Sequence, residues 1–534
     1  MTPIVVEAVK KDTIQFGQSV LNQKAIDRYQ ANNVAQLLDH MPSVGSAGSP
    51  RPGGQTINIL GMGGVADVPI TLDDSVKTFD KYRQGSVFIE PEILKKITVD
   101  KGPHNVEVGN GGFGGKVTLE TKDATDLLDE ADNGLVDGLF YYTNRDSGNV
   151  KRPDGSEFLY SGQEQETYLA KLNFYPADGH KISLNAMRSG HEGWEPFAAM
   201  RDQDAVPTEA DIAKYGYDEA WKRRLVDRDQ EDTSYSASYE FNPDANPYLN
   251  LKAVASYSKT YQHDLRLPSV TGSAALLGNE SWIGAQYQKM EQNSLIYDKN
   301  NVKKPDYNFG YYEPNYMPAG DQQMLSAFIE DQYQINNLII TPSLRYDHIE
   351  NNGKPNRASR FNDPAAGHDY SSKTYTGWSP RLAISWKQTD YMTWFANVSK
   401  TWRAPRVDEQ YYVQSAATTV PSTSRYLVPE KMLAIRVGNE MNFDDVFSNE
   451  DHLQVRLTYH HNRGGDEIFR NRSTFCQAQA ENNANNGSGS VADCKGNYDH
   501  GFYRNVTDYT IKAYEAEAFY NQPTCHSDFR GECA

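Results

Sequence analysis

The chain has 534 residues, several times the size of one ordinary domain, so two or more folded units are expected. Its formal net charge of -18 and its pI of about 5.2 argue against a general nucleic-acid-binding protein. No run of about 18 apolar residues occurs, which excludes a transmembrane helix. The mean hydropathy of -0.71 fits a soluble protein and fits equally well a membrane-spanning β-barrel, whose strands alternate in polarity.

The first segment with a structural signal is a short β-branched run close to the N-terminus. Such a run can pair, as an added strand, with the sheet edge of a partner protein, or it can be the ordinary first strand of a domain. No signal peptide precedes Thr2 and Pro3, so we expect a mature form with an added Met1. The run consists of Ile4, Val5, Val6, Glu7 and Ala8.

The next hundred residues predict a mixed α/β domain. A helix is expected over 24–40, because Val34, Leu37, Leu38 and Met41 recur at helical spacing before Pro42. The glycine-rich run from Gly109 to Gly115 allows left-handed backbone and close contact with another surface. A strand followed by a glycine turn is expected over 55–64, and further short strands are expected over 70–74 and 117–121.

From residue 134 onward the polarity alternates with period two, which is typical of β-strands with one apolar and one polar face. A soluble sandwich shares this alternation. Short turns that alternate with long loops, at about 190–230, 349–375, 403–429 and 462–509, favour a transmembrane barrel instead. Residues 260–322 hold either no crossing or two, so the total is 12 or 14 strands. The other strands are expected near 134–143, 164–175, 181–189, 231–241, 249–259, 323–334, 338–348, 376–387, 391–402, 430–442, 453–461 and 510–520.

The order of these features resembles the TonB-dependent outer-membrane receptors. The run TKDATDLL after the glycines is most similar to the haem/haemoglobin/transferrin/lactoferrin receptor family. The resemblance implies a 22-stranded transmembrane antiparallel β-barrel from residue 131 to 534, with a mixed α/β plug domain of residues 1–130 inside it. Since only 12–14 strands are visible, we expect the barrel to be incomplete at the C-terminus. Leu60, Lys101 and Val108 stand where the family usually has Arg, Arg and Tyr.

A second resemblance lies between two expected strands. Trp402-Arg403-Ala404-Pro405 and Leu427-Val428-Pro429-Glu430 resemble two short motifs of haem receptors, between which many members carry a haem-ligating histidine. Here 406–426 contains no histidine but does contain tyrosines, which can ligate ferric haem. The alternative for each candidate is a hydrogen-bonded or solvated polar residue. The candidate haem or substrate ligands are His104, His191, Tyr411, Tyr412, Tyr426, His460 and His461.

The four cysteines all lie in the last 59 residues, which fits an oxidising compartment. Four cysteines allow three pairings, and proximity favours Cys476–Cys494 with Cys525–Cys533. One further cluster gathers in an expected outer loop, and it predicts either a protein contact or packing among its own rings. That cluster is Tyr307, Phe309, Tyr311, Tyr312 and Tyr316.

The resemblance implies an active transporter of the Gram-negative outer membrane. It would take up haem, from haemoglobin or another haem-carrying protein, while TonB pulls on residues 4–8 from the periplasm. Its partners would be TonB, the haem or iron carrier and outer-membrane lipid, with haem as cargo rather than as a catalytic cofactor. No enzyme motif is present, so we expect neither catalysis nor a resident metal. The alternatives are a ferric-siderophore or transferrin-iron receptor, and a surface binding protein that does not transport.

Overall fold

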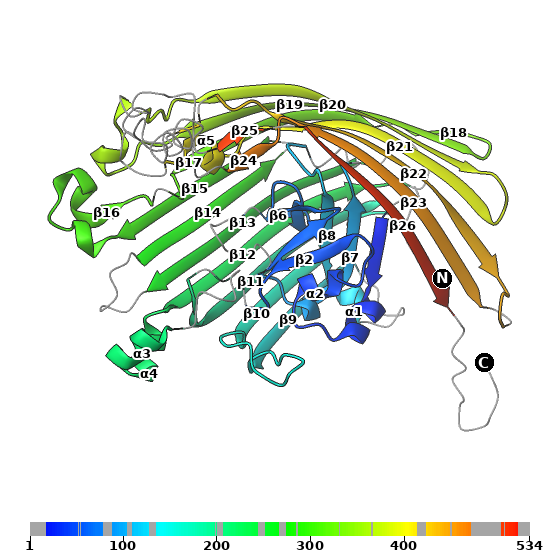
Figure 1. The fold of residues 1–534 in the computed structure, drawn as a ribbon. Coiled ribbons are helices and arrows are strands. Elements are labelled where there is room, and N and C mark those ends of the chain that lie inside the picture. The colour runs from blue at the N-terminus through cyan, green and yellow to red at the C-terminus, as the bar shows by residue number, and fades with distance from the viewer. Residues whose placement is uncertain are drawn as a thin grey trace, which may run out of the picture.

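The computed structural model describes most of the chain as a small mixed α/β domain held on the concave side of a long, curved β-sheet (Figure 1). Within the described part, no helix has the length and apolar character needed to cross a membrane. The described residues are 18–51, 53, 55–77, 79, 88–103, 109–127, 135–197, 199, 207–243, 251–265, 274–284, 287–314, 316–330, 332–364, 367–413, 423–424, 426–448, 451–470, 503–506 and 508–521.

The small domain, which we call the plug, contains two sheets and two short helices. One sheet has the order β1-β7-β8-β5-β6, in which β5 and β8 are parallel, and the other has the order β2-β3-β4. The elements are β1 (Gln18–Asn22), α1 (Gln23–Tyr29), α2 (Val34–Leu38), β2 (Val44–Gly48), β3 (Gln55–Ile59), β4 (Met62–Gly63), β5 (Ile70–Leu72), β6 (Ser75–Lys77), η1 (Pro91–Ile93), β7 (Leu94–Lys101), β8 (Gly115–Thr121) and η2 (Ala124–Asp126).

The single helix expected over 24–40 is wrong. The chain forms two helices because Gln30 adopts a left-handed conformation with φ of 47°, which ends α1. Asn33 then caps α2 by accepting a hydrogen bond from the Gln36 backbone N–H at 2.9 Å. The apolar face is as predicted, since Val34, Leu37 and Leu38 are fully buried in the plug core. Each such side chain contributes about 1.5–3 kcal/mol by leaving water.

The large sheet is antiparallel throughout, and its strands follow one another in chain order. Among the described residues it has sixteen strands, of which the short β16 and β18 lie off a path of fourteen. The path consists of β9 (Val136–Ser147), β10 (Gln163–Phe174), β11 (His180–Pro196), β12 (Leu225–Phe241), β13 (Leu251–Leu265), β14 (Ala274–Gly284), β15 (Tyr287–Tyr297), β17 (Gly320–Glu330), β19 (Leu338–Gly353), β20 (Lys373–Lys387), β21 (Met392–Arg403), β22 (Glu430–Asp444), β23 (His452–Gly465) and β26 (Tyr509–Asn521).

All twelve expected barrel strands are present, and β14 and β15 are the two crossings left open within 260–322. The sheet is therefore the fourteen-strand alternative, and among the described residues β9 and β26 are its two ends. The resemblance implied 22 strands in a whole barrel. The boundary expected at residue 130 lies outside the described residues and stays a prediction.

The two faces of the large sheet differ in polarity. On β20 the outward side chains include Trp378, Leu382 and Trp386, all exposed, while Arg381 on the opposite face points to the plug side. The concave face carries buried polar residues such as Gln165 and Asn173. An exposed apolar outer face with a polar interior is the arrangement of a lipid-embedded barrel, not of a soluble sandwich with a polar exterior.

The two ends of the sheet also differ. Short connections, such as 175–179 and 388–391, join strands at one end, and long loops join them at the other. The strands run further than predicted, so the loop expected over 190–230 spans only 197–224. At the long-loop end, on the left of Figure 1, lie α3 (Glu209–Tyr215), α4 (Tyr217–Lys222), β16 (Tyr311–Tyr312), α5 (Val407–Tyr411), β24 (Ile468–Arg470) and β25 (Tyr503–Asn505), while β18 (Tyr333–Ile335) lies at the other end.

Candidate functional site

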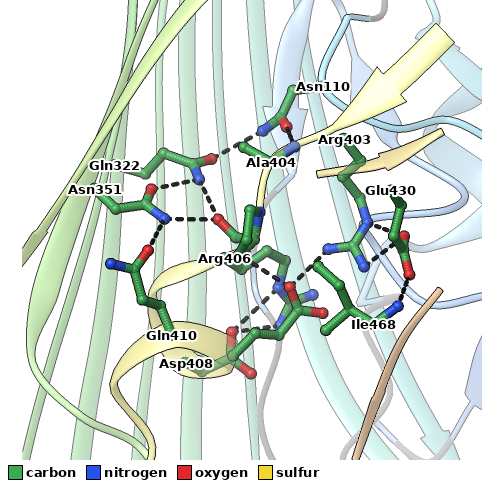
Figure 2. Close-up of polar contacts among 12 residues, drawn as sticks. Asn110, Gln322, Asn351, Arg403, Ala404, Arg406, Asp408, Gln410, Glu430 and Ile468 are labelled. Carbon is green, nitrogen blue, oxygen red and sulfur yellow. Dashed lines mark hydrogen bonds and ion pairs between the residues drawn. The ribbon is translucent and has the colours of Figure 1, made fainter. Parts of the chain in front are cut away.

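The motif that begins at Arg403 forms a buried polar cluster at the long-loop end of β21 (Figure 2). The Arg403 guanidinium donates through Nε to Glu430 Oε2 and through Nη1 to Glu409 Oε2, each at 2.7 Å. Glu430 also accepts a hydrogen bond from the backbone N–H of Ile468, at the start of β24. One arginine therefore joins the ends of β21, β22 and α5.

The next two residues of the motif connect this cluster to the plug and to two other barrel strands. The Ala404 backbone N–H donates to Asn110 Oδ1 at 2.8 Å, and Asn110 Nδ2 donates to Gln322 Oε1 at 2.9 Å. The Pro405 carbonyl accepts from Gln322 Nε2 at 3.1 Å and from Asn351 Nδ2 at 2.7 Å. We call Asn110, Gln322, Asn351, Ala404 and Pro405 the plug latch, because they hydrogen-bond the plug loop to β17, β19 and β21.

Local sequence explains why the chain turns here. Proline has no N–H for a sheet ladder, so β21 ends before Pro405. The Arg406 backbone N–H then donates to Glu409 Oε2 at 2.8 Å, which begins α5. On the plug side, Gly111 has φ of 117°, and a Cβ there would come within 2.3 Å of the Ala66 carbonyl oxygen. The glycine-rich run is thus required for this close approach.

Asp67 lies beside the same cluster. Burial raises the pKa of the Asp67 carboxyl to about 7, while the neighbouring Arg403 guanidinium partly offsets that effect and Glu430 adds to it. The carboxyl therefore changes charge near neutral pH at the point where the plug meets the barrel motif.

A pocket opens between the plug and the barrel beneath α5. Its plug side includes Val65, Ala66 and Pro69, and its barrel side includes Met290 of β15 and Gln322 of β17. Arg403, Arg406 and Asp408 contribute to the same lining. The plug latch therefore borders a space that lies between the two domains.

A second set of buried contacts fixes the plug near the sheet edge at β26. Lys101 Nζ lies 3.0 Å from Glu517 Oε1 and 3.3 Å from Glu515 Oε1, and Lys101 is only 1% exposed. Arg436 donates to the Lys101 carbonyl oxygen at 3.2 Å. The sequence contained a signal for this pairing, because two glutamates spaced by two on a strand face the same side.

Further ion pairs hold the plug against the opposite part of the sheet. Lys77 of β6 pairs with Asp232 of β12 at 2.7 Å. Lys171 of β10 lies 3.3 Å from Asp73 and 3.2 Å from Asp123, both in the plug. Hydrophobic periodicity gave no indication of these pairs, since each joins residues far apart in the chain.

The three tyrosines proposed as ligands occupy different environments. Tyr411 is buried, and its hydroxyl oxygen lies 3.0 Å from the Asn351 carbonyl oxygen and 2.8 Å from that of Ser371, so its one proton is shared between backbone acceptors, which favours a structural role. Tyr412 is also buried and packs edge-to-face on Tyr503. Tyr426 is 60% exposed in the long-loop region, so it is the member of the three whose side chain is accessible to a ligand.

The histidine candidates are not gathered in one place. His191 is buried within β11 rather than at the start of a loop, and its ring contacts the Glu164 carbonyl at 2.8 Å and Glu195 Oε1 at 2.5 Å. His460 faces the plug and its Nε2 lies 3.2 Å from Glu515 Oε2. His461 points to the other face of β23, where the Tyr459 hydroxyl and its Nδ1 lie 3.2 Å apart.

The remaining sequence candidates lie outside the described residues. These are the N-terminal run Ile4–Ala8, His104 and the four cysteines. Pro429, in the second motif, directly precedes Glu430 and is half-buried.

Two family descriptions match the chain. Residues 10–116 match the TonB-dependent Receptor Plug Domain, and residues 173–524 match the TonB dependent receptor-like β-barrel. Among solved structures, a double mutant of the Serratia marcescens hemophore receptor HasR, in complex with its hemophore HasA and heme, aligns with a TM-score of 0.68 at 17% identity. That alignment covers 95% of this chain and 79% of that one, and it shows a shared fold.

Curated relatives give the closer sequence comparison. The chain is 40% identical to the TonB-dependent heme receptor A of Haemophilus influenzae, over 97% of this chain and 76% of the relative. It is also 40% identical to the protein of the same name from Haemophilus ducreyi, over 95% of this chain and 75% of the relative. The Hemin receptor of Yersinia pestis is 23% identical over 84% of this chain and 68% of its own length. The chain therefore belongs to the TonB-dependent receptors, the plug-and-barrel proteins of the Gram-negative outer membrane.

Proposed function

We propose that the protein is a TonB-dependent outer-membrane transporter that takes up haem. The observation that carries this proposal is the 40% identity, over 97% of the chain, to a relative named as a TonB-dependent heme receptor. Identity at this level extends through the plug and the barrel rather than through a single motif. The protein acts as a receptor and carrier, with haem as cargo and with no role for catalysis.

In this function the plug closes the barrel until TonB acts on it. TonB binds the run Ile4–Ala8 as an added strand and pulls from the periplasmic side. The plug latch and the Lys101 pairs are the contacts that must break or shift when the plug moves. Outer-membrane lipid covers the apolar outer face.

The long loops then form the extracellular side, where haem arrives. Tyr426 is the exposed candidate ligand among the described residues, and His104 is the candidate from the plug. Phenolate and imidazole are both established axial ligands of haem iron. We propose these two residues, rather than the buried Tyr411 and Tyr412, as the first positions to test. Haem arrives free or on a carrier such as haemoglobin.

Haemin titration of the purified chain, followed by visible absorption, tests this proposal. We expect a Soret shift on binding, which Tyr426→Phe or His104→Ala alters while Tyr411→Phe leaves it unchanged. A chain that binds neither haemin nor haemoglobin would contradict haem uptake and would favour a ferric-siderophore cargo.

A further inference from the structure

The loop between β15 and β17, residues 298–319, presents two aromatic rings to solvent at the long-loop end. Phe309 is 55% exposed and Tyr311 is 50% exposed. The other rings of the loop are turned inward, since Tyr312 is buried with Phe361 and Met317 in a separate apolar cluster that Tyr307 and Tyr316 pack against. The loop thus separates its aromatic residues into an inner cluster and an outer pair. Figure 1 shows β16, which contains Tyr311, at the far left of the molecule.

The outer pair is held by an unusual backbone conformation. Asn308 and Phe309 both have left-handed backbone, with φ of 46° and 54°. Side chains other than glycine rarely adopt this conformation, and two in succession persist only where the surrounding structure enforces it. Such outliers gather at positions that serve recognition or another function.

Hydrogen bonds of Asp298 stabilise this backbone conformation. Its backbone N–H donates to the Gly310 carbonyl at 2.7 Å, and its carboxylate accepts from the Tyr312 hydroxyl at 2.8 Å. Asn308 Nδ2 donates to the Tyr311 carbonyl at 2.6 Å, and the Phe309 N–H donates to the Lys304 carbonyl at 3.1 Å. The aromatic pair is therefore presented by a rigid loop, and little conformational entropy is lost when a partner binds.

The same loop carries three exposed lysines, although the whole chain carries a charge of -18. None of Lys299, Lys303 and Lys304 has an ion pair among the described residues, and Lys304 Nζ donates a hydrogen bond to Asn301 Oδ1 at 2.7 Å. Three carboxylates lie in the same loop: Asp306 contacts Arg360 at 3.4 Å, the buried Glu313 contacts Arg357 at 3.3 Å, and Asp298 accepts the hydrogen bond from Tyr312. The exposed side chains of the loop thus include two aromatic rings and three lysines.

We infer that Phe309, Tyr311, Lys299, Lys303 and Lys304 form the docking surface for an acidic haem-carrying protein. Aromatic anchors inside a polar rim are typical of a protein–protein binding site. The lysines steer a negatively charged partner toward the receptor, which would otherwise repel it. This inference rests on the proposed function and adds to it the kind of carrier and the surface that receives it.

Binding of two carriers to the purified full chain tests the inference: haemoglobin and haem-loaded serum albumin. The variants are Phe309→Ala and Lys303→Glu, and Phe447→Ala is the matched control. Phe447 is 75% exposed in the short turn at the opposite end of the barrel. We expect Phe309→Ala to weaken carrier binding by about 30-fold, the size of a hot-spot loss, and the control to leave it unchanged. Lys303→Glu should weaken binding most at low salt.

Free haemin serves as the internal check on folding and on the proposed function. Each variant should bind haemin as the wild type does, because none of the substituted residues is a candidate haem ligand. Equal carrier binding by wild type and Phe309→Ala would overturn the inference, as would failure of both carriers to bind the wild type. Failure of the wild type to bind both haemin and the carriers would in addition overturn the proposed function, whereas haemin binding without carrier binding overturns the inference alone.

Discussion

Arg403 is the residue on which the long-loop end of β21 depends most. It is the cation for two buried carboxylates, those of Glu409 and Glu430. Removal of one partner from a buried ion cluster leaves the others uncompensated, which costs about 3–5 kcal/mol. We expect Arg403→Ala to lower the free energy of unfolding by that amount, measured by denaturant titration in detergent.

The conservative variant separates charge from geometry. Arg403→Lys keeps the positive charge but lacks the planar group that reaches both carboxylates. It should recover only part of the lost stability. Equal stability of Arg403→Ala and wild type would show that the cluster in Figure 2 does not hold the loop.

Asp67 makes the stability of the plug depend on pH. Its folded-state pKa of about 7 lies above the unfolded value of about 4, so the folded chain keeps a proton that the unfolded chain releases. The unfolding free energy therefore falls as pH rises through this window. The Asp67→Asn side chain cannot ionise. The unfolding free energy of this variant, relative to that of the wild type, should therefore rise by more than about 1 kcal/mol between about pH 4 and pH 7.

Hydrogen exchange of the plug amides at several pH values measures this difference. Asp27→Asn is the control, since Asp27 is exposed on α1. If the difference in plug stability between Asp67→Asn and the wild type stays constant with pH, burial does not raise the pKa of Asp67.

The sequence could identify the motif residues but not their partners. Arg403, Ala404, Pro405 and Glu430 were found by resemblance, and all belong to the buried cluster or the plug latch. The latch itself needs Asn110, which bonds a residue 294 positions away. Strand and helix periodicity carries no information about such a contact, and nothing in one sequence says that Tyr411 uses its hydroxyl inside the loop.

At the scale of elements, period-two alternation was enough to find most barrel strands. It failed for β14, AALLGNESWIG, because its apolar residues come in runs and two glycines interrupt the pattern.

The plug helix was misjudged for a different reason. The apolar face from Val34 to Met41 was predicted correctly. The left-handed Gln30 and the Asn33 cap nevertheless divide the segment into two helices, because capping residues decide where short helices begin and end.

The attachment of plug strand β7 to β26 gives a prediction at this scale. Lys101 is buried between Glu515 and Glu517, whereas Lys96 on the same strand pairs with Glu120 at the surface. We expect Lys101→Ala to destabilise the plug by about 3 kcal/mol and Lys96→Ala by less than about 1 kcal/mol. Hydrogen exchange along β7 distinguishes the two, and equal effects would contradict a buried anchor.

At the scale of the whole molecule, ion pairs hold the plug near both ends of the strand order of the large sheet. Near one end of the sheet, Lys77 of the plug pairs with β12, and Lys171 of β10 pairs with the plug. Near the other end, Lys101 of the plug pairs with β26. The latch joins the plug to β17, β19 and β21 between these regions. Hydrogen bonds and ion pairs are directional, and they can break one after another. They therefore suit a domain that must stay in place yet move when it is pulled. The loop lengths favoured a barrel and the family resemblance implied a plug inside it, while the arrangement of these anchors was not predictable.

TonB-dependent haem uptake is tested by the accumulation of radiolabelled iron from haemin in cells that express the full chain or a variant lacking residues 3–8. We expect both proteins to bind haemin at the cell surface. Only the full chain should accumulate iron, and only when TonB is present. Accumulation that survives the deletion, or a full chain that binds haemin but never accumulates iron with TonB present, would contradict TonB-dependent haem uptake.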